Sequence, residues 1–510
     1  MPEPRTWQLA AGSAVLGLAL AAGAAGAAGP WDSGQRKAER ARAVLADDRG
    51  GAHHAGPPAA PRRPAPAPSA PGVLRALDAG TRPAAPGTTK QTTRTGDLAA
   101  VLVPLLADPG LGPLRTASVV DTTTGRQLYG EGAATPMTPA STVKIATAAA
   151  ALSALGPDHR IATTTVAAPD GRTVTLVGGG DPTLDRTRLK ALADATARAL
   201  KARGTTTPVR LTYDTSLYTG PTLHPIGPNE NLAPVTALMT DEGRLDGSRS
   251  GPAPRTADPA GATATAFADL LRKAGVTVQG TPAPGKAPKP PKAAGATGTA
   301  DDKTEGHDQA TGEDRATAAG PKTAAPLART ESAPLADLVE RTLTHSDNDL
   351  AEALARQTAL ARRQPASFAG AGKAVHDELA RLRLPLAGAR FADGSGLDRD
   401  DRVSAALLTG ILTRAADPAR PALRPVLTGL PVGGFSGTLA GRFDTGPAVS
   451  GAGLVRAKTG TLTGVNTLAG TVVTADGRLL AFAFLAGRTT SPYTAQPALD
   501  RLSAALAPPR

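Results

Sequence analysis

The chain has 510 residues, a formal net charge of +12 and no cysteine. Its length is enough for roughly two or three domains with sizeable cores, and the lack of cysteine excludes disulfides and thiolate chemistry. The arginines are dispersed and aromatic residues make up only 3% of the chain, so we expect no nucleic-acid partner. The positive charge indicates an attraction to anionic polymers or membrane surfaces.

The N-terminal residues 1–29 have the pattern of an export signal. Arg5 precedes an uncharged run from Trp7 to Gly29 that is rich in small residues, as in a signal peptide or a signal-anchor. The run is long enough to span a bilayer, but its Ala/Gly content makes it a weak transmembrane helix, and the basic stretch from Arg36 opposes the usual orientation. We expect an extracytoplasmic protein of the cell envelope, either secreted or membrane-anchored through this segment.

Residues 30–97 are dominated by Pro, Ala, Gly, Ser and Thr, as in GPPAAPRRPAPAPSAPG. Such a composition provides too little apolar surface to bury in a core. The segment is therefore predicted to be a disordered tether.

Ordered sequence begins at Leu98, and LRTASVVDTTTGRQLYGEGA predicts two strands joined by a turn. The next stretch, TPASTVKIATAAAALSALGP, predicts a helix that begins at Ser141 and ends at Gly156. Because three residues advance a helix by about 300°, Ser141 and Lys144 lie on one face, one turn apart. This is the geometry of a nucleophile with an attached base.

A serine hydroxyl is a poor nucleophile until a base removes its proton, and a neutral lysine amine can do so. To be neutral near pH 7, Lys144 needs a pKa lowered by about three units, for which an apolar wall is required. The apolar helix provides that wall. For this pair alone, an ordinary surface lysine is the alternative interpretation.

Two later motifs strengthen the catalytic interpretation. Ser346 and Asn348 lie two residues apart before an apolar-periodic helix in LTHSDNDLAEAL, where a simple N-cap is the alternative. The third motif lies on an alternating strand, where an edge-strand lysine is the alternative, and consists of Lys458, Thr459, Gly460 and Thr461. The TADGRLLAFAFLAG stretch that follows predicts an antiparallel hairpin around its Asp-Gly turn. Together, Ser-x-x-Lys, Ser-x-Asn and Lys-Thr-Gly in this order match the signature of penicillin-binding proteins and serine β-lactamases.

The chain resembles the class C low-molecular-mass penicillin-binding proteins, the D-alanyl-D-alanine carboxypeptidase/endopeptidase family. Residues 145–345 separate the first two motifs, and class C enzymes carry extra domains at this point. Five further stretches look like those of the family: LVGGGDPTL, LTYDTSLYTGP, APVTALMTDEGRLD, FADGSGLDRDDRVS and LPVGGFSGTL. The resemblance covers roughly residues 98–508.

The resemblance implies an α/β (α+β) fold, with a β-lactamase/transpeptidase-like antiparallel sheet flanked by helices and extra domains inserted between the first two motifs. We expect the catalytic domain at residues 98–160 and 327–510. The inserted domains are expected at residues 161–279, followed by a disordered low-complexity insertion at residues 280–326.

The resemblance also implies acyl transfer from the D-Ala-D-Ala bond of peptidoglycan stem peptides, with β-lactam antibiotics as covalent inhibitors. Ser141 would attack the penultimate D-Ala carbonyl and Lys144 would take its proton. Ser346 would relay the proton to the leaving amine, and Asn348 would orient Lys144 and the substrate amide.

The third motif would bind the substrate. Lys458 would attract the terminal carboxylate, helped by the hydroxyls of Thr459 and Thr461. The backbone N–H groups of Ser141 and Thr461 would form the oxyanion hole. Asp214, in TYDTS, is a candidate for contacting the substrate's side chain, with a strand-end turn residue as the alternative.

No cofactor and no metal are expected, because no paired histidines occur at helical metal spacing. Two other functions are alternatives to the carboxypeptidase. A β-lactamase-like hydrolase usually needs a dedicated carboxylate for fast deacylation; none is identified, and the long insert also argues against it. A non-catalytic envelope scaffold would normally have lost a motif residue, and all of them are present.

Overall fold

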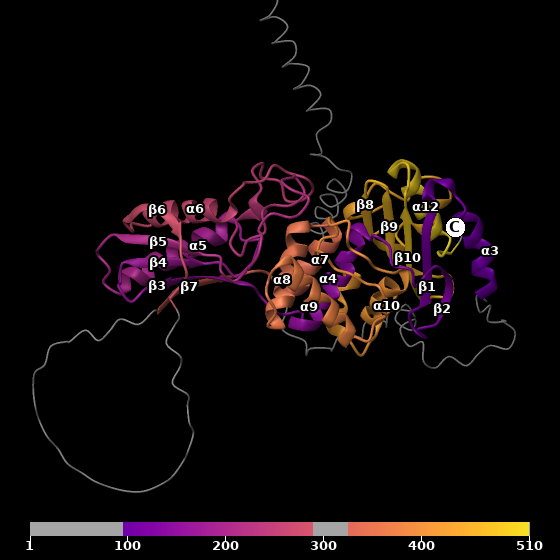
Figure 1. Cartoon of the computed structure of the whole chain (residues 1–510), viewed down its shortest axis with the longest axis horizontal. Helices are drawn as coiled ribbons and strands as arrows, with labels where there is room; N and C mark the ends of the chain where they lie inside the picture. The colour runs from indigo at the N-terminus through magenta and orange to yellow at the C-terminus, as the bar shows by residue number, and fades with distance from the viewer. Residues whose placement is uncertain (1–94, 289–324, 509–510) are drawn as a thin grey trace, which may run out of the picture. The chain divides into compact units, whose positions relative to one another are not determined.

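The computed structural model describes residues 95–288 and 325–508, and these elements fall within one compact unit, Lys90–Arg510. The expected export segment, nearly all of the tether and most of the low-complexity insertion lie outside the described residues. The described part contains two five-stranded sheets, each with its own helices (Figure 1). Among the described helices, none has both the length and the apolar character needed to cross a bilayer.

The larger sheet is antiparallel throughout and brings together the two ends of the described chain. The predicted turns close its hairpins, with Gly125 and Gly477 at positive φ as tight turns require. The N-terminal hairpin is then joined to the C-terminal strands by pairing between Val119 and Phe482. In spatial order the strands are β2 (Gln127–Glu131), β1 (Leu114–Asp121), β10 (Leu479–Gly487), β9 (Val465–Val473) and β8 (Val455–Leu462). Both predicted hairpins are therefore confirmed.

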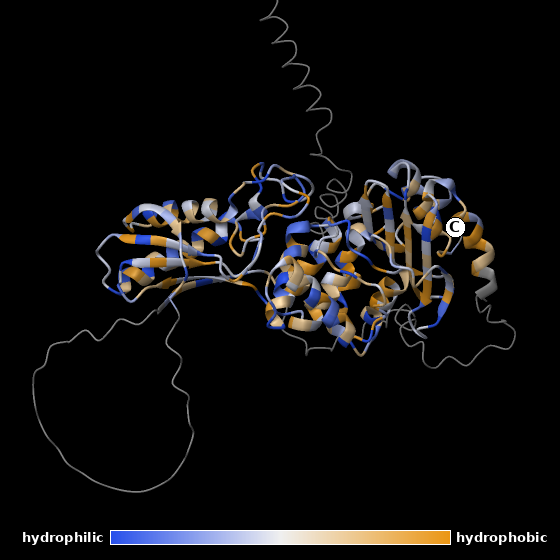
Figure 2. Cartoon of the chain, in the orientation of Figure 1, coloured by the Kyte–Doolittle hydropathy of each residue, from blue (hydrophilic) through white to orange (hydrophobic). Residues whose placement is uncertain are grey.

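Helices cover both faces of this sheet, whose central strands are largely apolar (Figure 2). One face packs against α3 (Thr95–Leu106) and α12 (Pro492–Ala504). The other face packs against α10, which belongs to a helical layer centred on α4. This layer comprises α4 (Lys144–Leu155), α7 (Leu335–His345), α8 (Asn348–Ala361), α9 (Phe368–Arg381), α10 (Ala405–Ala416) and the short α11 (Pro425–Thr428). The antiparallel sheet flanked by helices confirms the expected fold class.

Helix α4 is enclosed on all sides, and its sequence explains why this is possible. Every residue from Lys144 to Leu152 is buried, and four consecutive alanines from Ala148 let α8 and α9 pack closely around it. The helix begins differently from the prediction: a 3-10 turn, Ala140–Val143, holds Ser141, and regular α-helix starts at Lys144. Gly156 ends the helix at positive φ, as predicted.

The smaller sheet lies between the first two motifs in the chain. Its strands are, in spatial order, β6 (Val278–Pro284), β5 (Val209–Asp214), β4 (Thr173–Val177), β3 (Ala162–Ala167) and β7 (Ala325–Glu331). Two helices, α5 (Arg186–Ala202) and α6 (Pro259–Lys273), contribute to its separate core. This arrangement gives the expected insertion a structure of its own.

Strands β6 and β7 extend into residues 280–326, where the sequence predicts disorder. Their prolines and alanines carry no strand signal, but both are edge strands, where a missing N–H donor is tolerated. Pairing with β5 and β3 thus supplies the order that composition does not predict. The inserted sheet also extends to Glu331, past the boundary expected at residue 326.

The chain between β6 and β7 must join opposite edges of the sheet, and both strands run in the same direction. Crossing four strand spacings and returning along a strand requires about nine extended residues. We expect deletion of residues 297–316, half of this connection, to leave the melting temperature within about 2 °C of the parent, as loop shortening costs little. Deletion of residues 286–322 leaves three residues and should disrupt an edge strand, with a lower melting temperature by circular dichroism. Equal melting of both deletions would contradict the strand order.

Candidate active site

The three sequence motifs meet at the N-terminal end of α4. Ser141 lies in the 3-10 turn that precedes the helix, and Lys144 is its first residue. The Lys144 Nζ lies 2.9 Å from Ser141 Oγ and 2.7 Å from Asn348 Oδ1. Strand β8, which carries Lys458, packs against the same turn. The structure therefore brings residues from three distant segments into one site.

The hydrogen bonds of Lys144 define the direction of its lone pair. Besides Ser141 and Asn348, its Nζ donates to the backbone oxygen of Ser395 at 2.5 Å. The amide and backbone oxygens can only accept, so they occupy two N–H groups. A neutral amine has only two N–H groups, and its lone pair then faces the Ser141 hydroxyl. The amide orientation of Asn348 is supported by its Nδ2, which donates to Asn231 O at 3.0 Å.

The environment of Lys144 favours the neutral form. Its side chain is fully buried, and burial lowers its pKa to about 8, although Asp393 and Asp347 act in the opposite direction. The wall predicted from the sequence is thus present. A pKa of about 8 leaves a useful neutral fraction near pH 7.

Ser346 and Asn348 lie where α7 ends and α8 begins. Ser346 adopts the left-handed conformation, with φ of 58°, which costs a non-glycine residue about 1 kcal/mol. The N-cap of α8 is Asp347, whose side chain accepts from the Leu350 N–H at 3.0 Å. The capping role that was the alternative interpretation for Ser346 and Asn348 therefore belongs to Asp347. Neither of the two motif residues is the N-cap of α8.

Lys458 is a second fully buried lysine. Burial and the neighbouring Lys144 lower its pKa well below the usual range. Its Nζ donates to Thr459 O at 2.8 Å. Next along the strand, Thr461 is exposed, and β8 is an edge strand, so backbone groups of this strand can meet a bound peptide.

Gly460 allows β8 to approach the turn that carries the nucleophile candidate. A Cβ at this position would lie 2.1 Å from Thr467 Oγ1 and 2.6 Å from Pro139 O. Thr467 Oγ1 donates to Pro139 O at 2.8 Å and so ties the sheet to the turn. A side chain at residue 460 would push these elements apart.

Asp214 lies at the end of β5 in the smaller sheet. Its Oδ1 accepts from the Ser216 N–H at 2.8 Å and its Oδ2 from the Ala287 N–H at 2.7 Å. Burial alone would raise the pKa of Asp214, but these donors hold it below its usual range. The geometry is that of a turn residue, and the predicted substrate contact stays a prediction.

Sequence reasoning did not assign a role to several residues that surround Lys144. The lysine's second acceptor is the backbone oxygen of Ser395, in the FADGSGLDRDDRVS stretch, and two N–H groups of this loop donate to Glu352. Glu352 lies one turn after Asn348 on α8 and is buried. In the sequence, an acidic residue four positions after Asn348 was the signal that could have pointed to it.

The insert also reaches the second motif through charged contacts. Arg255 pairs with Asp349 at 2.6 Å and donates to the backbone of Glu242. Since Asn348 donates to Asn231 O, residues of the insert contact both Asn348 and the adjacent Asp349.

Two groups of acidic and histidine side chains have donor atoms close enough for a metal ion within the described residues. In both, arginines or backbone N–H groups already occupy the carboxylate oxygens, which fits ion pairing better than metal ligation. The first group is Glu242, Asp347 and Asp349, paired with Arg244, Arg341 and Arg255. The second group is His224, Glu352 and Asp393.

A β-lactamase-like fold with these three motifs at one site defines the active-serine penicillin-binding enzymes. The D-Ala-D-Ala carboxypeptidase 3 (S13) family matches residues 98–253 and 309–506. The chain is 34% identical over 480 residues to Carboxypeptidase DacB of Mycolicibacterium smegmatis, covering 89% of this chain and 91% of that protein. It is 29% identical over 432 residues to a D-alanyl-D-alanine carboxypeptidase of an Actinomadura species, covering 74% and 78%.

Among solved structures, penicillin binding protein 4 of Haemophilus influenzae has the same fold, with a TM-score of 0.59 and 22% identity over 80% of this chain and 97% of that one. The chain belongs to the D-Ala-D-Ala carboxypeptidase 3 (S13) family. It is a serine-type D-alanyl-D-alanine carboxypeptidase/endopeptidase, a hydrolase among the class C low-molecular-mass penicillin-binding proteins.

The close approach at Gly460 yields a prediction. Gly460→Ala should destabilise the protein by about 1–3 kcal/mol through overpacking and slow acylation by a fluorescent penicillin at least tenfold. Gly441→Ala is the matched control, because a Cβ there meets nothing within 4 Å, and it should behave as the parent. Denaturant unfolding and labelling kinetics provide the two measurements, and a fully active Gly460→Ala would contradict the packing described here.

Proposed function

We propose that this carboxypeptidase works through an acyl-enzyme on Ser141, with Lys144 as the general base. The observation that carries the proposal is the hydrogen bonding of Lys144 Nζ. Two groups that can only accept occupy its N–H groups, and its lone pair faces Ser141 Oγ at 2.9 Å. The lowered pKa of Lys144, caused by burial, supports the same role.

The proposed reaction assigns one step to each of these side chains. Ser141 Oγ attacks the penultimate D-Ala carbonyl while its proton passes to Lys144 Nζ. The backbone N–H groups of Ser141 and Thr461 stabilise the oxyanion, a device in which one donor is worth about 3–4 kcal/mol. The C–N bond breaks as Ser346 gives its hydroxyl proton to the leaving amine and takes up the proton held by Lys144. Water hydrolyses the acyl ester in the second half of the reaction and regenerates the serine.

The substrate is proposed to be the D-Ala-D-Ala end of a peptidoglycan stem peptide, bound along β8. Its terminal carboxylate would lie near Lys458 and the hydroxyls of Thr459 and Thr461. A carboxylate at this point raises the pKa of a buried amine and so favours its charged form. Asn348 both fixes Lys144 and presents an amide to the substrate. β-Lactams, which carry a carboxylate beside a reactive amide, would acylate the same serine.

The base assignment predicts different results for one substitution at two lysines. An arginine keeps the positive charge but does not deprotonate in proteins. Lys144→Arg should therefore lower the acylation rate by about 10²–10⁴-fold, the usual loss of a positioned base. Lys458→Arg should be milder, because a guanidinium still attracts a carboxylate. Acylation by a fluorescent penicillin, with folding checked by circular dichroism, measures both.

Two controls complete this experiment. Ser141→Ala should give no covalent label, and undiminished labelling of that variant would refute the nucleophile. In the parent enzyme the acylation rate should rise with pH through about 8, since the neutral form of Lys144 is the active one. Equal rates for the two arginine variants would mean that Lys144 acts as a fixed charge.

We also propose that residues 1–29 direct export, so that the enzyme acts outside the cytoplasm, either released or anchored through that segment. The uncharged run from Trp7 to Gly29 after Arg5 supports this proposal. The full chain, expressed in an actinobacterial host, should be recovered in envelope or medium fractions, and deletion of residues 1–29 should retain it in the cytoplasm. Intact-mass measurement then distinguishes a cleaved signal from an anchor. Unchanged fractionation of the deletion would refute the export role.

A further inference from the structure

One of the three groups that orient Lys144 is a backbone oxygen, and a backbone oxygen must be positioned by its surroundings. The oxygen belongs to Ser395, which is fully buried in the loop between α9 and α10. Asn348, the other fixed acceptor, is held at the start of α8. The direction of the lysine lone pair therefore depends on how firmly the Ser395 loop is placed.

The loop is folded around the carboxylate of Asp393. Its Oδ1 accepts from the N–H groups of Ser395 at 3.0 Å and Gly396 at 2.6 Å. Its Oδ2 accepts from Ser395 Oγ at 2.8 Å and from the N–H groups of Leu397 and Asp398 at 3.0 Å. These bonds lie within the loop, so they set its shape but not its position relative to α4.

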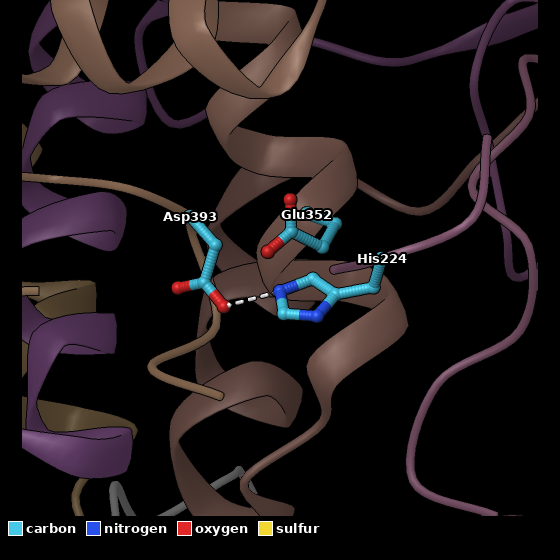
Figure 3. A group of neighbouring side chains, drawn as sticks. All are labelled: His224, Glu352 and Asp393. Atoms are coloured by element: carbon cyan, nitrogen blue, oxygen red, sulfur yellow. Dashed lines mark hydrogen bonds and ion pairs between the residues drawn. The ribbon is translucent and has the colours of Figure 1, made fainter. Parts of the chain in front are cut away.

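Position comes from contacts outside the loop, one of which is the bond from Thr147 Oγ1 of α4 to Gly394 O at 2.8 Å. Glu352 of α8 accepts from the Gly394 N–H at 2.9 Å and the Ser395 N–H at 3.1 Å. His224, from the insert, holds Asp393 through Nε2 and Oδ2 at 2.9 Å (Figure 3). The Ile226 N–H donates to His224 Nδ1 at 3.2 Å, so the proton lies on Nε2 and is donated to Asp393.

The two anchoring carboxylates lie close to each other, which makes the histidine contact important. One carboxylate oxygen of Glu352, one of Asp393 and a ring nitrogen of His224 all lie within 4.8 Å of one another. The negative charges of the two carboxylates therefore repel each other. Arg356 pairs with Glu352 at 2.7 Å, whereas His224 is the group that meets Asp393 from outside its loop. Burial alone would raise the pKa of Asp393, but the bond from His224 and the loop donors hold it well below its usual range.

The ring of His224 is itself firmly placed. It is 3% exposed and packs edge-on against Phe368, with 5.2 Å between ring centroids. Phe368 also carries Arg356 over its face, at 4.2 Å. The histidine and the arginine thus rest on the same aromatic ring, and each meets one of the two carboxylates.

We propose that His224 is a positioning residue for acylation: by holding Asp393 it fixes the Ser395 carbonyl on Lys144 and so directs the lysine lone pair at Ser141. The proposal rests on the base role of Lys144 given above. It makes a residue of the inserted segment part of the acylation machinery, although it touches neither the substrate nor the serine.

The test compares His224→Leu with His224→Gln. Leucine fills the space but cannot donate, and Asp393 keeps five donors from its own loop, so the fold should persist. A glutamine amide reaches about as far as Nε2 and can still donate to Asp393. The matched control is His159→Leu, because the His159 side chain makes no hydrogen bond among the described residues.

The measurement is the rate constant for acylation by a chromogenic cephalosporin between pH 6 and 10, beside the melting temperature. In His224→Leu the plateau rate should fall about tenfold or more, as expected for a misplaced group. The midpoint should also move down by about half a unit, because a lost acceptor favours the neutral amine. His224→Gln should regain both values, and His159→Leu should match the parent enzyme.

Several results would overturn the proposal. One is a parent-like rate and midpoint in folded His224→Leu. Another is a lower rate with an unmoved midpoint, which would indicate a structural role alone. If His224→Leu does not fold, His224→Asn replaces it, since asparagine is too short to reach Asp393, and unfolding of both would assign His224 to stability only. A parent-like Lys144→Arg enzyme would instead refute the proposed function, so the two failures are distinguishable.

Discussion

The enclosure of one amine, Lys144 Nζ, is the constraint on which the rest of the site depends. A buried amine is costly unless its N–H groups find acceptors, and here two acceptors come from different elements, Asn348 on α8 and the Ser395 backbone. The alanine-rich α4 permits this enclosure because its neighbours approach closely on all sides. The larger sheet then brings β8 against the same turn, with Gly460 at the contact. All of these features contribute to keeping the Lys144 side chain away from solvent.

The insert contributes to this enclosure at two separate places. Asn231 and Arg255 border the Ser-x-Asn motif, through Asn348 and Asp349. His224 meets the Asp393 loop through a separate contact. The Arg255–Asp349 and His224–Asp393 pairs are buried, where electrostatic interactions are stronger than at a surface. The chain between the first two motifs is therefore not only an addition to the catalytic domain, since it supplies groups that border the lysine's two fixed acceptors.

The sequence predicts the parts of this structure that depend on side-chain identity and local pattern. The hairpins and helix α4 follow from periodicity and turn residues, and the meeting of Ser141 and Lys144 with Asn348 follows from the motif order and the family resemblance. Ser395 could not be found in this way, because it acts through a backbone oxygen that every residue possesses. His224 pairs with Asp393 across 169 positions, and no local pattern links them. The proline-containing strands β6 and β7 escaped prediction because their order comes from sheet pairing, not from composition.

The site is organised at the expense of stability. The pKa of Lys144 falls from 10.5 to about 8 on folding, which corresponds to about 3 kcal/mol against the folded state where the unfolded lysine is protonated. This cost is fully present below pH 8 and is relieved as pH rises from about 8 to 10.5. In that range Lys144 is protonated in the unfolded chain and neutral in the folded protein, so each rise in pH favours the folded state. Lys458, also lowered by burial, acts in the same direction, and the left-handed Ser346 adds backbone strain. The large core around α4 must offset all three, which explains why this buried amine is found on an enclosed helix with a large core around it and not at the surface.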